Sequence, residues 1–196
     1  MIEAVLSASP LFWPGVLCSL LLAVLLSRPV GRLLRAHRAA GFLLVLALGG
    51  IVTLTLLPDT RLPLWANARY AVRQCTFDRV GPHPLAELFT ATQSSLNVAL
   101  FVPLGLTAAL AGTWGRRVAA GSVAALIPFA VESTQYAIPA LGRACDGQDL
   151  LDNYFGLALG LALGALAGPV ARVLVRARRR AADRRTADRR TAHGGT

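Results

Sequence analysis

Residues 153–171 read NYFGLALGLALGALAGPVA, a run without a single charged side chain. About 20 apolar residues in a helix cross the ~30 Å hydrocarbon core of a bilayer. Because a spanning segment must satisfy its own backbone hydrogen bonds, this run predicts a membrane-spanning helix. Gly156, Gly160, Gly164 and Gly168 recur every four residues on one face. A row of small residues of this kind predicts close packing against another helix.

Other parts of the chain also lack charge. Residues 4–27, 39–58 and 88–115 contain no charged side chain, and residues 118–142 contain only Glu132. With the first run, they predict five spans, near residues 11–27, 40–57, 95–112, 118–137 and 150–174. The composition agrees, because 55% of the 196 residues are hydrophobic and only 15% are charged. Soluble domains have about 25% charged residues, so we expect no nucleic acid as a partner despite the net charge of +10.

The basic residues fall mostly on one side of the predicted membrane. All 20 are Arg, and alternating the loops between five spans places fifteen on one side and five on the other. Cytoplasmic loops are enriched in Lys and Arg. The sequence therefore predicts an all-α membrane protein with about five transmembrane helices, its N-terminus outside and its C-terminus in the cytoplasm. The first span has no basic residue before it, unlike a secretory signal peptide.

The chain divides into a membrane domain, residues 1–175, and a basic tail, residues 176–196. The tail repeats the sequence ADRRT at residues 182–186 and 187–191 and contains few apolar residues. Such a composition predicts disorder. Its Arg side chains would fix the orientation of the protein and contact anionic lipid headgroups of the bilayer.

Two of the three cysteines lie on the predicted outer side. Cys75 is in a long loop, residues 58–94, and Cys145 is in the short loop before the last span, whereas Cys18 is within the first span. Disulfides persist outside the cytoplasm, so we predict a Cys75–Cys145 disulfide that ties the long loop over residues 143–149. The alternative is two unpaired thiols. In the same loop, residues 85–93 predict either a short interfacial helix or an ordinary ordered loop.

Polar side chains at membrane depth are rare and costly, so each is a candidate for function. The predicted topology gathers several at the outer end of the bundle, because the third and fifth spans begin there and the fourth ends there. They are Asn97, Glu132, Gln135, Arg143, Asp146, Asp149 and Asn153. The helical spacing of Glu132 and Gln135 puts both on one face, as does that of Asp149 and Asn153.

Each of these residues also has a structural explanation. Asn97 and Gln135 would hydrogen-bond neighbouring helices. Glu132 would be neutral, or would pair with Arg143, which offsets the cost of burying its charge. Asp149 would cap the start of the last helix. Their concentration at one end favours a binding site for the cluster as a whole.

Two blocks resemble the VanZ-like family of small bacterial membrane proteins. Residues 97–105 read NVALFVPLG and are similar to the family's N-x3-F-x-P-x-G block. The second block is Glu132-x2-Gln135, followed by Arg143-x2-Asp146-x2-Asp149-x3-Asn153-x2-Gly156. The resemblance implies a VanZ-like multi-pass domain over residues 1–175, with its motif core at 95–165, in a bacterial cell membrane. The matching positions are the seven polar residues together with Gly105 and Gly156.

The family takes its name from a protein associated with resistance to the glycopeptide teicoplanin, and the resemblance brings no established reaction. The first hypothesis is therefore a non-enzymatic protein that binds a lipid headgroup, a cell-wall precursor or a lipophilic glycopeptide at the outer cluster, with a role in glycopeptide resistance. Arg143 would grip a phosphate or carboxylate through two hydrogen bonds.

Two alternatives remain open. One is an enzyme acting on a lipid-linked substrate, with Glu132 and Asp149 as acid and base or as ligands of a hard cation. The other is a structural or partner-binding subunit that docks through the glycine row at Gly156, Gly160 and Gly164. The sequence has no His in the cluster, no serine elbow, no P-loop and no Cys/His metal spacing. These features favour the non-enzymatic hypothesis, with catalytic residues unknown and no cofactor or metal.

Overall fold

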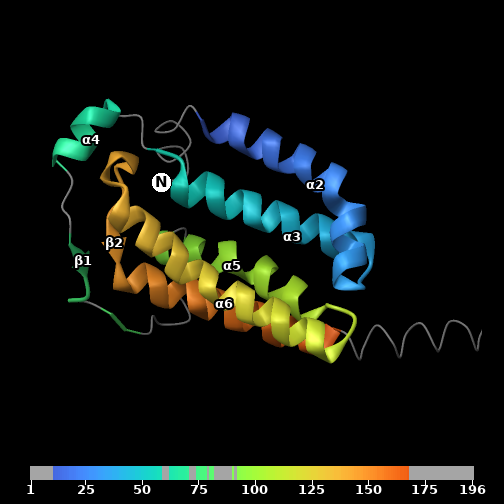
Figure 1. Cartoon of the computed structure of the whole chain (residues 1–196). Coiled ribbons are helices and arrows are strands. Elements are labelled where there is room, and N and C mark those ends of the chain that lie inside the picture. The colour runs from blue at the N-terminus through green and yellow to red at the C-terminus, as the bar shows by residue number, and fades with distance from the viewer. Residues whose placement is uncertain are drawn as a thin grey trace, which may run out of the picture.

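The computed structural model describes residues 11–58, 62–70, 74–78, 80–81, 90 and 92–167. The predicted tail, residues 176–196, and most of the predicted interfacial helix at 85–93 lie outside these ranges. Long helices run side by side in a bundle, and several short elements gather at one end of it (Figure 1). The all-α prediction is confirmed.

The long helices overlap the five segments that were predicted as spans. They are α2 (Phe12–Leu34), α3 (Arg38–Ile51) with its π-helical continuation η1 (Val52–Leu56), α5 (Gln93–Ala109), α6 (Trp114–Ala137) and the last described helix, Gly147–Ala167. The first two and the last are long and apolar enough to cross a membrane. Helix α5 has only 17 residues. Helix α6 has 24 residues but includes Arg116, Arg117 and Glu132.

The short elements lie between these helices in the sequence. They are α4 (Leu64–Tyr70), β1 (Cys75–Thr76), η3 (Pro139–Leu141) and β2 (Cys145–Asp146). Strands β1 and β2 form a small parallel sheet in which Cys75 lies opposite Cys145. We call the end of the bundle that carries β1 and β2 the disulfide end. Neither α4 nor this strand pair was predicted from the sequence.

The glycine row of the last helix faces α5. A Cβ atom added at Gly156 or Gly160 would lie 2.1 Å from the carbonyl oxygen of Val98 or Val102, respectively. On the opposite side of the contact, a Cβ added at Gly105 would lie 2.1 Å from the carbonyl oxygen of Leu157. Gly164 continues the row against Ala109, and Gly168 lies outside the described residues. The two helices therefore touch backbone to backbone, within one chain.

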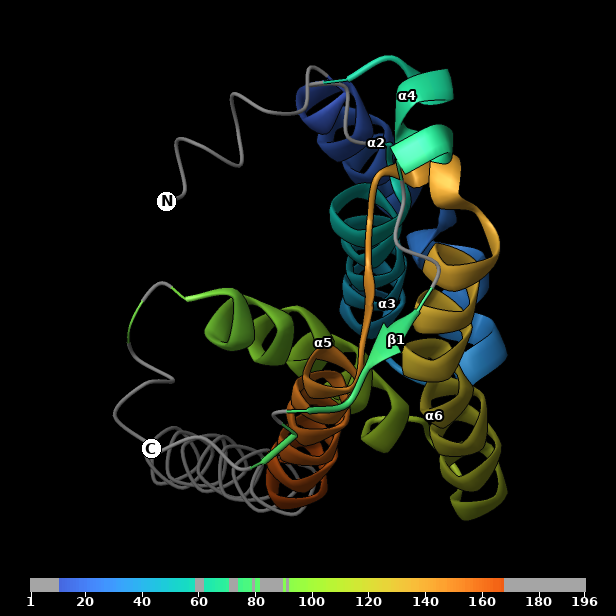
Figure 2. The same ribbon diagram turned by 90° about the vertical axis from the view of Figure 1, so that its left-hand side faces the viewer.

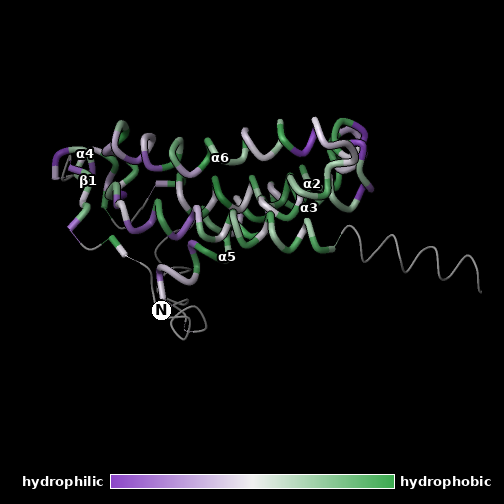
Figure 3. The backbone as a smooth tube through the Cα atoms, turned by 90° about the horizontal axis from the view of Figure 1, so that it is seen from below, coloured by the Kyte–Doolittle hydropathy of each residue, from purple (hydrophilic) through white to green (hydrophobic). Residues whose placement is uncertain are grey.

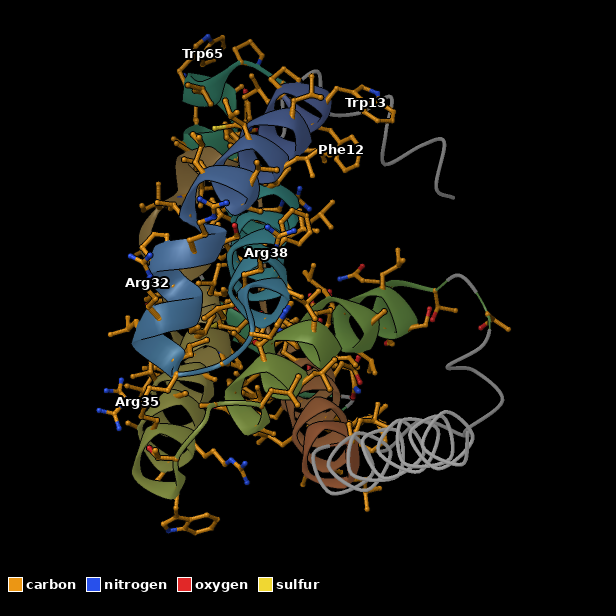
Figure 4. The ribbon with its side chains drawn as sticks, turned by 90° about the vertical axis from the view of Figure 1, so that its right-hand side faces the viewer. Phe12, Trp13, Arg32, Arg35, Arg38 and Trp65 are labelled. Carbon is orange, nitrogen blue, oxygen red and sulfur yellow. A yellow bond between two sulfur atoms is a disulfide. The ribbon has the colours of Figure 1, made fainter. Side chains whose placement is uncertain are left out.

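The surface of the bundle is suited to lipid. Leu17, Leu21 and Leu25 of α2 are each at least 60% exposed, whereas hydrophilic residues gather at the two ends (Figure 3). Trp13 at the start of α2 and Trp65 of α4 lie toward the disulfide end of the bundle, whereas Arg35, after the end of α2, lies toward the other end (Figure 4). Exposed Trp114 lies at that other end too, and aromatic side chains at both ends are typical of helices that anchor at membrane interfaces.

Candidate functional site

A layer of polar side chains lies one helical turn beyond the hydrophobic core. Ile51, Phe101, Val131 and Leu157 come from four different helices and belong to one buried cluster. Four positions nearer the disulfide end, these helices carry the residues that we call the polar layer: Thr55, Asn97, Gln135 and Asn153. Residues four apart share a helix face, so the polar layer faces the same interior as the core.

Two amides of the polar layer are almost fully buried. Gln135 is 8% exposed and Asn153 is 2% exposed. The Nε2 of Gln135 donates to the carbonyl oxygen of Thr55 at 3.0 Å, one of the carbonyls that the end of a helix leaves without a partner. The Oε1 of Gln135 and the Oδ1 of Asn153 are buried without a hydrogen-bond partner. The layer thus holds two unsatisfied acceptors.

Three carboxylates lie beside the polar layer. Glu132 is 5% exposed, and its Oε2 accepts a hydrogen bond from the backbone N–H of Asp146 at 3.1 Å. The side chain of Asp149 accepts two bonds from Nε2 of Gln93, at 2.9 and 3.1 Å, and a further one from Asn97. Asp146 and Asp149 are close enough to act electrostatically on Glu132. We call these three acids and the polar layer together the polar cluster.

Asp146 caps the last helix, so the capping role predicted for Asp149 is wrong. The Oδ1 of Asp146 accepts from the backbone N–H of Gln148 at 2.9 Å. The helix begins at Gly147, three residues earlier than its predicted start. Asp149 therefore lies within the first turn, where its carboxylate binds the amides of α5 instead.

Arg143 lies in the loop between η3 and β2 and is partly buried. Its Nε is buried without a hydrogen-bond partner. Among the described residues no ion pair joins it to Glu132, whose recorded hydrogen bond comes from a backbone N–H instead. The Glu132–Arg143 pair considered from the sequence is therefore not formed.

The sequence analysis missed two glutamines at this end of the bundle. Gln93 binds Asp149, and Gln148 donates through Nε2 to Oδ1 of Asp152 at 3.0 Å. Gln93 stands four residues before Asn97 and was placed outside the predicted third span. A signal was present, because Thr92 and Ser95 form a capping box that starts α5 at Gln93. The Gln148 contact had no such signal, since it depends on the path of the loop.

The predicted disulfide is present, with an S–S distance of 2.01 Å between Cys75 and Cys145. It holds residues 75–78 and 80–81, which we call the strap, beside β2 and the start of the last helix (Figure 2). The side chains of Phe77 and Val80 leave no room for a Cβ at Gly147. The backbone N–H of Gly81 donates to Oε1 of Gln148 at 2.9 Å. The strap is thus fixed next to the polar cluster.

The carboxylates do not form a ready metal site. Within the part of the chain that the structure describes, no three His, Cys, Asp or Glu side chains are grouped so that they could hold a metal ion. The acids instead accept hydrogen bonds from separate donors. Each of the three acids beside the buried amides therefore accepts hydrogen bonds from a donor of its own.

Comparison with known families gives one match. The family model described as VanZ/LLP1 matches residues 16–168, which include the whole polar cluster, the strap and the glycine row. No curated protein and no solved structure matches the chain.

Proposed function

The chain belongs to the VanZ/LLP1 family, and from this premise we propose that it is a non-enzymatic membrane protein that binds a ligand at the polar cluster. The ligand classes are those with a polar group attached to an apolar or cell-wall moiety: a lipid headgroup, a cell-wall precursor or a lipophilic glycopeptide such as teicoplanin. Binding of the last class would give the protein a role in glycopeptide resistance.

We also propose that the protein crosses the bacterial cell membrane five times, with the disulfide end outside. Three helices are long and apolar enough to span a membrane, and α5 packs by its backbone against one of them. Helix α6 contributes Val131 to the shared core. The disulfide and the excess of Arg at the opposite end support this orientation, because disulfides persist outside and Arg is retained in the cytoplasm.

The observation that carries the binding proposal is the pair of unsatisfied acceptors in the polar layer. Proteins leave few buried polar atoms without a partner, and each costs about 1–3 kcal/mol. Gln135 and Asn153 nevertheless each keep one, next to a group of carboxylates. A ligand that donates hydrogen bonds there would recover that free energy. Arg143, with its own unsatisfied Nε, would bind an anionic part of the same ligand.

The two alternatives have less support. In the docking alternative, the glycine row must be open to a partner, but α5 of the same chain occupies it. In the enzymatic alternative, Glu132 and Asp149 must act on a substrate as acid and base. They accept hydrogen bonds from the backbone N–H of Asp146 and from Gln93, and among the described residues no contact singles out a proton-transfer pair.

The antibiotic-binding form of this proposal predicts that Arg143 determines glycopeptide susceptibility. A host that expresses the wild type should be less susceptible to teicoplanin than the empty host, and Arg143→Ala should lose most of this protection. The control is Arg69→Ala, which removes an exposed Arg of α4 at the same end of the bundle. Equal susceptibility of wild type and Arg143→Ala, at equal amounts of protein in the membrane, would contradict antibiotic binding.

A further inference from the structure

We infer that the ligand group held in the polar cluster is an organic primary ammonium, which donates its N–H groups to Gln135, Asn153 and the neighbouring carboxylates. The inference rests on the proposed binding function and names the chemistry of that site. It follows from three properties of the site: the kind of buried atom that lacks a hydrogen-bond partner, the acidic side chains beside it, and the lack of a metal-binding group among the described residues.

The buried amide atoms that lack a hydrogen-bond partner are acceptors. The hydrogen bond from Nε2 of Gln135 to Thr55 fixes the orientation of the amide, so the unsatisfied atom is the oxygen. The Oδ1 of Asn153 is also unsatisfied, and this side chain lies one turn beyond Leu157 on the core-facing side. An acceptor is satisfied only by a donor. A phosphate or carboxylate oxygen cannot fill this role, whereas an N–H group can.

Two acidic side chains, Glu132 and Asp149, lie beside these atoms. Glu132 and Asp149 receive hydrogen bonds from a backbone N–H and from neutral amides, so none of these donors brings a positive charge. Arg143 makes no ion pair with a described acid. Buried carboxylates are stable when a cation or several hydrogen bonds compensate them. The electrostatic complement of the cluster is therefore a cationic donor.

The kind of side chain present favours an ammonium over a metal ion. A divalent metal is held mainly by charged or metal-ligating side chains, and the described residues offer no group of three acidic, His or Cys side chains that could hold one. A primary ammonium carries three N–H donors on one nitrogen. In the proposed complex these donate to oxygens of α6 and of the last helix.

A primary ammonium is present both in lipid headgroups and in soluble amines, and binding measurements separate the two sources. The purified full chain in detergent is titrated calorimetrically with dihexanoyl phosphatidylethanolamine, with its trimethylated counterpart dihexanoyl phosphatidylcholine, and with free ethanolamine. The quaternary ammonium has the same charge but no N–H donor. We expect the primary amine lipid to bind at least about tenfold more tightly, a difference of about 1.4 kcal/mol. Binding of free ethanolamine would identify the soluble source, and its absence the lipid source.

Two variants test whether the amine lipid binds in the polar cluster. Asp149→Asn removes an acid and Asn153→Leu removes an unsatisfied acceptor, and each should weaken binding of the ethanolamine lipid by about tenfold. Asn153→Leu should leave binding of the choline lipid unchanged, because that lipid has no N–H donor. The control is Asp78→Asn, an exposed acid on the turn after β1. Thermal unfolding of each variant verifies that it is folded.

The outcomes separate this inference from the proposed function. Equal binding of the two lipids by the wild type, with loss of both in Asp149→Asn, would overturn the ammonium inference and leave the binding site intact. A folded wild type that binds no amine probe would also overturn it, while loss of glycopeptide protection in Arg143→Ala would still support the proposed function. Binding that no cluster variant changes would contradict both.

Discussion

At the residue scale, Gln135 and Asn153 differ in what their amides do for the fold. Gln135 joins α6 to the end of η1 through its bond to the Thr55 carbonyl. Asn153 has a buried oxygen without a donor, and the structure records no compensating bond from it. A side chain of this kind lowers stability in the unliganded protein, and the proposed ligand would account for its presence.

This difference predicts opposite effects of two substitutions. Asn153→Leu should leave the unliganded protein as stable or up to about 1 kcal/mol more stable, because it replaces an unsatisfied polar atom with apolar volume. Gln135→Leu should lower the free energy of unfolding by about 1–2 kcal/mol, because it strands the Thr55 carbonyl. Unfolding in detergent measures both. Equal destabilisation by the two would identify Asn153 as a structural residue.

All members of the polar cluster except Thr55 could be found from the sequence, but their contacts could not. Glu132, Gln135 and Asn153 stand out because polar side chains are rare in apolar runs. The hydrogen bond from the backbone N–H of Asp146 to Glu132 depends on the backbone path of β2. Helical periodicity does not predict that path. The partner of Asp149 depends on the residue at which α5 begins.

At the element scale, the contact between α5 and the last helix has no space for side chains. Gly160→Ala would place its Cβ 2.1 Å from the Val102 carbonyl oxygen, so the helices must separate, at a cost of about 1–3 kcal/mol or more. The matched control is Gly121→Ala in α6, where no atom lies within 4 Å. It should raise stability by about 0.5–1 kcal/mol through helix propensity. Equal unfolding temperatures for the two variants would contradict this packing.

The strap depends on its disulfide, which closes a loop between residues 70 positions apart. The double variant Cys75→Ser/Cys145→Ser should lose about 2–5 kcal/mol of stability. Its backbone amides at residues 75–78 and at the start of the last helix should exchange hydrogen faster. Cys18→Ser is the control, because Cys18 is a free and exposed thiol. Unchanged exchange in the double variant would show that other contacts hold the strap.

Long elements could be predicted from the sequence and short ones could not. Each apolar run is long enough to specify a helix by composition alone. Helix α4 has seven residues, and each strand has two, so neither carries a repeating pattern. The strands owe their position to the pairing of Cys75 with Cys145, which only the predicted topology indicated.

At the scale of the whole molecule, the proposed orientation predicts which surfaces are accessible from outside the cell. In a Cys18→Ser background, a membrane-impermeant maleimide applied to intact cells should label Asp78→Cys on the strap side. It should not label Gly115→Cys, in the first turn of α6 at the opposite end, where the position is equally open. Both should react after lysis. Labelling of Gly115→Cys alone in intact cells would reverse the orientation.

The length of α5 has a consequence for the surrounding bilayer. At 1.5 Å per residue, its 17 residues measure about 25 Å, less than the ~30 Å hydrocarbon thickness. In the proposed five-span topology, α5 would be a short span that thins the lipid around it, and its first residue, Gln93, binds Asp149. The leaflet should therefore dip beside the polar cluster, so that a lipid-borne ligand can enter sideways from within the membrane rather than from the water above it.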